Sequence, residues 1–155
     1  MKVLIATDGT KYAEAAVEML GKFKLSDGDS VKVISVVDLA MPLAVDVYGG
    51  YLPDTTQLEK AARENAEKAV KITVDRLSEL FGENLAVSSD VLFGSPDSRI
   101  VETAEAISAD LIVIGSHGYN RWERLLLGSV SHSVVHHAPC SVMVVRIPQA
   151  DSTGR

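Results

Sequence analysis

Glycine and serine residues in one connection of the chain have the types and spacing that suit phosphate binding. Gly115 and Gly118 follow an apolar segment, and Gly128 and Ser129 come later, where a helix is predicted to begin. A glycine lets a ligand approach the backbone closely because it has no Cβ atom. The free N–H groups at a helix N-terminus attract phosphate, and the hydroxyls of Ser129 and Ser131 add donors. These residues therefore indicate a phosphate site, although a turn and a helix cap alone would also use glycines.

The elements that must position these residues alternate between short apolar strands and amphipathic helices. The predicted strands are residues 2–7, 31–37, 86–93, 111–114 and 141–147. The predicted helices are residues 11–23, a long helix capped by Asp54 or Thr55 and ending at Gly82, residues 97–108, and a helix from near Ser129. Thr10 is predicted to cap the first helix, and Ser95-Pro96 to open the third. The alternation predicts an α/β fold, a three-layer sandwich with an open five-stranded parallel sheet.

Sheets of this kind bind ligands beyond the carboxyl ends of their strands, where the strand order reverses. The positions in this sequence that meet the rule are Thr7-Asp8, Val37-Asp38, Phe93-Gly94 and the residues after Ile114. The irregular segment 38–54 is long enough for a functional loop. We therefore expect the chemistry of the chain at these strand ends.

Length and charge exclude several classes of function. The 155 residues predict a single domain over 1–147 and a flexible tail over 148–155. The charge balance of 15 − 21 = −6 offers no basic stripe, so we expect no nucleic-acid partner. No apolar run reaches the roughly 18 residues of a membrane span, so we expect no membrane partner and a cytoplasmic location. The single cysteine, Cys140, excludes an internal disulfide and a cysteine-based zinc site.

The glycine spacing, together with Asp8 at the end of the first strand, resembles the ATP-binding branch of the universal stress protein family. The matching pattern is Gly115-x2-Gly118-x9-Gly128-Ser129, and the likeness extends over residues 2–147, including LLLGSV at 125–130. The resemblance implies a Rossmann-like fold of the adenine-nucleotide alpha-hydrolase type. It also implies ATP, with Mg²⁺ held through the phosphates, and a homodimer formed through the last strand, 141–147.

The resemblance further implies a set of ligand-binding residues. Those along the adenosine would be Ala6, Thr7 and Asp8, with the Asp8 carboxylate near the ribose hydroxyls. The backbone of Val36 would face the adenine edge, and Ile114 and Gly115 would line the base and ribose. The residues around the phosphates would be Gly118, Gly128, Ser129, Val130 and Ser131. Asp8-Gly9 is also an ordinary turn dipeptide, so the sequence alone leaves the role of Asp8 open.

Other functions remain as alternatives or fail on chemistry. No G-x-x-x-x-G-K-[ST] segment is present, so fast ATP hydrolysis is not expected. A slow ATPase acting as a timed switch, and a dimeric stress protein that binds no nucleotide, both stay open. A phospho-acceptor receiver would need an aspartate where Phe93-Gly94 stands. His132 and His136 have metal-ligand spacing but no evident third ligand, so packing or solvated histidines are favoured. Arg121 and Arg124 have two open roles, pairing with phosphate oxygens or lying as solvated charges on a loop, and Trp122 is expected to pack this segment onto the body or against a dimer partner.

Overall fold

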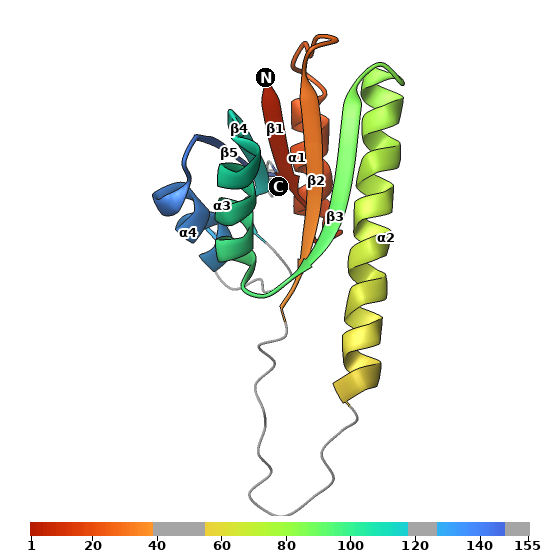
Figure 1. The fold of residues 1–155 in the computed structure, drawn as a ribbon, viewed down its shortest axis with the longest axis vertical. Helices are drawn as coiled ribbons and strands as arrows, with labels where there is room; N and C mark the ends of the chain where they lie inside the picture. The colour runs from red at the N-terminus through yellow and green to blue at the C-terminus, as the bar shows by residue number, and fades with distance from the viewer. Residues whose placement is uncertain (39–54, 118–126, 148–155) are drawn as a thin grey trace, which may run out of the picture.

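In the computed structural model, which describes residues 1–38, 55–117 and 127–147, the chain forms five strands and four helices (Figure 1). The strands are β1 (Lys2–Ala6), β2 (Ser30–Val37), β3 (Ala86–Phe93), β4 (Leu111–Gly115) and β5 (Ser141–Val145). The helices are α1 (Lys11–Leu20), α2 (Thr55–Phe81), α3 (Pro96–Ile107) and α4 (Ser129–His137). None of these described helices combines the length and apolarity that crossing a membrane requires.

The strands form one parallel sheet in the order β3-β2-β1-β4-β5. The chain leaves β1 toward β2 and β3, and then returns to the other side of β1 to form β4 and β5. The strand order therefore reverses between β1 and β4, which is where a fold of this kind offers a crevice to a ligand. The predicted fold class, an α/β protein with an open five-stranded parallel sheet, is confirmed.

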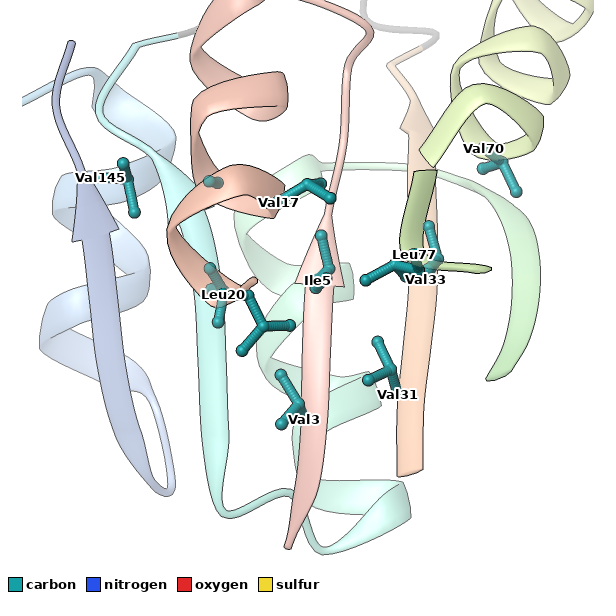
Figure 2. Packing of buried hydrophobic residues seen from close by; sticks show 11 residues of the cluster. Val3, Ile5, Val17, Leu20, Val31, Val33, Val70, Leu77 and Val145 are labelled. Carbon is teal, nitrogen blue, oxygen red and sulfur yellow. The ribbon is translucent and has the colours of Figure 1, made fainter. Parts of the chain in front are cut away.

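Alternating side chains on the strands build a core on each face of the sheet. Val3 and Ile5 of β1 pack with residues of α1 and α2, whereas Leu4 packs on the other face, with α3 and α4. Figure 2 shows Val17, Leu20, Val70 and Leu77 of the helices over the strand side chains of the first cluster. Burial of each such aliphatic side chain contributes about 1.5 to 3 kcal/mol. These two clusters keep the carboxyl ends of β1, β2 and β4 next to one another.

Two predicted element ends differ from the observed ones by two or more residues, each for a physical reason. The last strand was predicted over 141–147, but β5 ends at Val145 because its partner on β4, Gly115, is the last residue of that strand. The first helix was predicted to reach residue 23, but α1 ends at Leu20, where the N–H of Gly21 donates to the carbonyl of Val17 and the N–H of Lys22 donates to that of Met19. Residues 39–54 of the loop predicted over 38–54, and the predicted tail at 148–155, lie outside the described residues.

Candidate ligand-binding site

A cavity of about 730 Å³ lies at the carboxyl ends of β1, β2 and β4, at the point where the strand order reverses. Its walls also include the first residues of α3 and α4 and one side of α2. Ten of the predicted site residues line it: Ala6, Thr7, Asp8, Val36, Ile114, Gly115, Gly128, Ser129, Val130 and Ser131. Gly118 lies outside the described residues, as do Arg121, Trp122 and Arg124. The topology thus brings into one cavity residues that stand more than a hundred positions apart in the sequence.

The N-terminus of α4 opens toward this cavity with free backbone donors. The first hydrogen bond of the helix runs from the N–H of His132 to the carbonyl of Gly128 at 2.9 Å. The N–H groups of Ser129, Val130 and Ser131 therefore precede the helical ladder, as the first N–H groups of any helix do. Together with the positive end of the helix dipole, they make this part of the cavity wall suitable for an anion.

Hydrogen bonds to one carbonyl fix the turn before α4. The N–H of Gly128 donates to the carbonyl of Ser116 at 2.9 Å, and the hydroxyl of Ser131 lies 3.1 Å from the same oxygen. The Ser131 hydroxyl also lies 3.0 Å from the carbonyl of Gly128. Its single proton is therefore held by backbone carbonyls. In this structure the side chain of Ser131 fixes the turn, and its role toward a phosphate stays a prediction.

The absence of a side chain at Gly115 is explained by a neighbouring helix. A Cβ atom at Gly115 would lie 2.7 Å from the carbonyl carbon of Tyr12 and 2.8 Å from its oxygen, which is far inside normal contact distance. Gly115 also lines the cavity, but the first turn of α1 is what requires a glycine there. At Gly128 the contact is milder, because a Cβ would lie 3.3 Å from the Ser116 carbonyl oxygen.

Asp8 shapes the entry of α1 with one of its carboxylate oxygens. Oδ1 accepts hydrogen bonds from the N–H of Thr10 at 3.0 Å and from its hydroxyl at 2.6 Å. Thr10 does occupy the N-cap position, but its side chain makes no bond to the helix backbone, because its hydroxyl donates to Asp8 instead. No described residue donates to Oδ2 of Asp8. That oxygen is available to a ligand at the rim of the cavity.

Three hydrogen bonds fix the position of Thr7. Its N–H donates to the carbonyl of Ile34 at 2.9 Å, which extends the pairing of β1 with β2 by one residue. Its hydroxyl oxygen accepts from the N–H of Gly9 at 3.3 Å and from the buried hydroxyl of Thr73 on α2 at 3.2 Å. These contacts fix the backbone immediately before Asp8.

The cavity includes residues that sequence reasoning did not identify. After β3 the wall begins with Ser95, Pro96 and Asp97, whereas the predicted residues at this strand end were Phe93 and Gly94. The rule of strand carboxyl ends pointed to this connection but stopped one residue before the wall begins. The others are Ala13 on α1, Ile34 and Ser35 on β2, Ala62, Asn65 and Ala66 on α2, and Ile100 on α3. No motif in the sequence marks the α2 residues, because their place depends on how the long helix crosses the sheet.

Asp97 joins α3 to α4 beside the cavity. Its carboxylate accepts hydrogen bonds from the hydroxyl of Ser95 at 2.5 Å and from that of Ser133 at 2.7 Å. These two hydrogen bonds hold the pKa of the Asp97 carboxyl below its usual range. The bond from Ser95 lowers the pKa most, and the bond from Ser133 comes second. Asp97 is therefore a carboxylate at neutral pH.

The charges around the cavity are acidic. The carboxylates of Asp8, Asp38 and Asp97 line it, and among the described lining residues there is no lysine or arginine.

Within residues 1–38, 55–117 and 127–147, no group of three or more His, Cys, Asp or Glu side chains could hold a metal ion. The rings of His132 and His136 lie 4.4 Å apart, and His136 uses Nδ1 to bond the carbonyl of His132.

The sequence and the fold match known proteins. The model of the universal stress protein family matches residues 1–146. A universal stress protein of Methanocaldococcus jannaschii is 34% identical over 151 residues, which cover 97% of this chain and 84% of the relative. A putative universal stress protein of Staphylococcus aureus is 34% identical over 146 residues, which cover 93% of this chain and 82% of the relative.

Solved structures share the fold. The protein MJ0577 superposes with a TM-score of 0.78 at 26% identity, covering 96% of this chain and 97% of its own. A universal stress protein in complex with cAMP gives a TM-score of 0.66 at 23% identity, covering 94% of this chain and 96% of its own. A universal stress protein family member from Arabidopsis thaliana with AMP bound gives 0.65 at 16% identity, covering 99% and 95%. With the family model matching nearly the whole chain, this protein belongs to the universal stress protein family.

Proposed function

We propose that the cavity binds an adenine nucleotide, ATP, and that nucleotide binding is the biochemical function of the chain. The observation that carries this proposal is the placement of the α4 N-terminus, with its three free N–H groups, on the wall of a cavity of about 730 Å³. A volume of this size suits a nucleotide-sized ligand. Two proteins of the same fold bind related ligands, cAMP in one and AMP in the other.

The two ends of the cavity suit the two ends of a nucleotide. Phosphates would lie at α4, where Ser129 and Val130 present N–H groups. The base would lie at the β2 end, where the backbone of Val36 is available and Ala66 and Ile100 are apolar. Asp8 stands between these ends, where its free Oδ2 would accept a ribose hydroxyl.

Magnesium fits the chemistry of this cavity as a companion of the phosphates. The three lining carboxylates give the wall a negative charge, and the described residues contribute no lysine or arginine to offset it. A divalent cation would neutralise part of the charge on the phosphates. Asp8 and Asp97 are the carboxylates of the site that would attract the hydrated ion.

A thermal unfolding experiment tests the binding proposal. ATP with Mg²⁺ should raise Tm according to RT ln(1 + [L]/Kd), because it binds only the folded chain. Gly128→Val should abolish this rise, since its added Cβ would lie 3.3 Å from the Ser116 carbonyl oxygen and its branched side chain would displace the turn that presents the α4 N–H groups. The matched control is Gly28→Val, because Gly28 has no atom within 4 Å of an added Cβ.

Two outcomes would contradict the proposal: no shift with the unmodified protein, or an equal shift in Gly128→Val. Calorimetry with ATP, ADP and AMP on the same preparation ranks the three nucleotides. A time course of phosphate release separates a protein that only binds ATP from a slow ATPase.

A further inference from the structure

The strand β3 forms one outer edge of the sheet, and no strand among the described residues lies on its free side. The N–H of Gly94 donates to the carbonyl of Val37 on β2, which fixes the direction of the backbone groups along β3, because these alternate. Three residues of β3 therefore turn both the N–H and the carbonyl away from β2: Val87, Ser89 and Val91. Such unpaired backbone groups are a template for an additional strand.

The features that usually protect an edge strand from pairing are nearly absent from β3. Natural edge strands are often very short, bulged, or interrupted by lysine or proline. By contrast, β3 has eight residues, contains neither lysine nor proline, and pairs with β2 along its whole length without a bulge. Its single charged residue is Asp90. The β3 edge is therefore open to a strand of another molecule.

A groove of about 480 Å³ lies beside this edge, between β3 and α2. Figure 1 shows α2 alongside β3 at this side of the sheet. Val70 and Val74 of α2 and Val91 of β3 line the groove, and all three pack in the core cluster under α2. Val87 packs in the same cluster, so the residues with unpaired backbone groups have their side chains on the α2 face. An added strand would place every second side chain in this groove, where apolar side chains would contact the valines.

The α2 side of the groove is electrically neutral, because its charged side chains pair with one another. Nε of Arg63 lies 3.0 Å from Oε1 of Glu67, and Nζ of Lys71 lies 2.6 Å from Oδ2 of Asp75. These four residues therefore do not select a charge on the bound strand.

Asp90 supplies the charge preference on the other face of β3. Its side chain is 56% exposed, and its Oδ2 bonds Lys32 on β2. No described residue donates to its Oδ1. On an added strand, the residue beside Asp90 would be a direct cross-strand neighbour, and opposite charges stabilise such pairs. Asp90 therefore favours a lysine or arginine at that position.

We propose that the β3 edge and its groove bind an extended segment of a partner protein, with apolar residues at alternate positions and a basic residue beside Asp90. The segment would become a sixth strand, held by backbone hydrogen bonds and selected by its alternating side chains. A second copy of β3 fits less well. A two-fold axis at the groove would bring two Asp90 carboxylates onto one face, roughly 8 Å apart or closer. The inference is independent of nucleotide binding.

Titrations with two synthetic peptides test the proposed pattern. The probe is the capped and fluorescently labelled heptapeptide TVKVKVT, whose valines share one face and whose lysines share the other. Its sequence reads the same in both directions, so it offers the same pattern to either strand direction. The comparison peptide, TVEVEVT, should bind about two- to fivefold more weakly, the usual effect of cross-strand charges.

Asp90→Asn should remove most of the difference between the two peptides. Asp27→Asn is the matched control, because it removes the same charge from an exposed turn before β2. It should leave the difference unchanged. Fluorescence anisotropy measures the four sets of affinities.

Hydrogen exchange on the unmodified protein locates the bound peptide. TVKVKVT should slow the exchange of the Ser89 and Val91 N–H groups, whereas the N–H groups of Ser88 and Asp90 already face β2 and should change little. Ser89→Pro removes an outward N–H and should abolish binding. Ser89→Ala keeps the backbone and should bind as the unmodified protein does. If Ser89→Pro does not fold, the exchange pattern and Asp90→Asn decide.

Four results would overturn the inference. The first is no binding of TVKVKVT to the unmodified protein, and the second is protection of β5 in place of β3. The third is equal binding to Ser89→Pro and Ser89→Ala. The fourth is an unmodified protein that sediments as a larger species than Ser89→Pro, since a second copy would then occupy the edge.

Discussion

The hydroxyl of Ser133 on α4 donates a hydrogen bond of 2.7 Å to the carboxylate of Asp97 on α3. This bond connects the helices that follow β3 and β4, and Asp97 also lines the candidate cavity. Ser133 follows Ser129 by four residues, so the two serines lie on the same side of α4, about one helical turn apart. The bond therefore fixes α3 against the helix whose N-terminus we propose to hold phosphate.

The first prediction concerns this bond and the pH dependence of stability. Ser133→Ala should lower the free energy of unfolding by about 1 kcal/mol at pH 7, because a hydrogen bond to a charged acceptor is lost at a partly exposed site. The pKa of Asp97 is lowered in the folded state, so the contribution of its charge is present above the unfolded pKa of about 3.9 and is lost as pH falls through the folded value. The difference between the two proteins should therefore shrink below about pH 4.

Urea unfolding at pH 7, 5, 4 and 3 measures this difference. Ser78→Ala is the matched control, because the exposed Ser78 hydroxyl on α2 bonds only the carbonyl of Val74 within its own helix. Its effect should not change with pH. A difference between Ser133→Ala and the unmodified protein that stays constant from pH 7 to 3 would refute the role assigned to the Asp97 charge.

The second prediction concerns the approach of β4 to α1. Gly115→Ala should lower the free energy of unfolding by about 1 to 3 kcal/mol, because the added Cβ would lie 2.7 Å from the carbonyl carbon of Tyr12 and the backbone must shift. Gly28→Ala serves as the control, since an added Cβ there meets no atom within 4 Å. Chemical unfolding monitored by circular dichroism measures both. Equal midpoints for the two variants would show that the crowding at Tyr12 is relieved without cost.

Local pattern was sufficient to predict the layer architecture of this chain. The apolar runs that became β1, β2 and β4 are too short for helices, and the glycine turns and helix caps between them set the boundaries to within a few residues. The carboxyl-end rule then pointed to the ends of the strands, and the resemblance supplied the ten predicted site residues that line the cavity. Family resemblance supplied what the rule could not, because periodicity does not say which strand ends face each other.

Contacts between distant residues could not be predicted in the same way. The hydrogen bond between Asp97 and Ser133 joins residues that are 36 positions apart in the sequence, and neither their types nor their spacing predicts it. The glycine at 115 was explained by a ligand, whereas the neighbouring α1 is what requires it. Ser35 appeared in the sequence as one residue of an apolar strand, and only the fold places it on the cavity wall.

The third prediction concerns Asp8. Asp8→Ala should weaken ATP about ten- to a hundredfold, because hydrogen bonds to a charged group are each worth about 1.5 to 3 kcal/mol. It should weaken 2′,3′-dideoxy-ATP much less, since that nucleotide has no ribose hydroxyls for the carboxylate to accept from. Calorimetry with the two nucleotides measures the difference.

Asp8→Asn separates the ligand role from the turn. The amide oxygen of asparagine can still accept from Thr10, as Oδ1 of Asp8 does, whereas the amide nitrogen would replace the acceptor Oδ2 with a donor. This variant should therefore keep the stability of the unmodified protein and still lose affinity for ATP. Equal losses for ATP and its dideoxy analogue in both variants would remove Asp8 from the ribose.

The fourth prediction concerns the exposed edge of β5, which ends the sheet beside β4. Val142, Met143 and Val144 are only partly buried in the single chain, and no lysine interrupts the strand. The carbonyl of Val145 accepts from the N–H of Ser116, so Val145 turns its backbone groups toward β4. Because backbone groups alternate along a strand, Val144 turns its groups outward. An apolar edge of this kind invites pairing with another strand.

We propose that β5 pairs with its copy about a two-fold axis, and Val144→Pro tests this. Proline at 144 removes an N–H that points away from β4, so it should leave the sheet of one chain intact while it disfavours pairing between chains. The backbone of Gly94 bonds Val37 on β2, so by the same alternation Ser89 turns its own groups outward from β3. Ser89→Pro at the opposite edge is therefore the matched control. In sedimentation at tens of micromolar, the unmodified protein and Ser89→Pro should be dimers, whereas Val144→Pro should be a monomer. An unmodified protein that sediments as a monomer, or a Val144→Pro variant that stays dimeric, would exclude β5 as the interface.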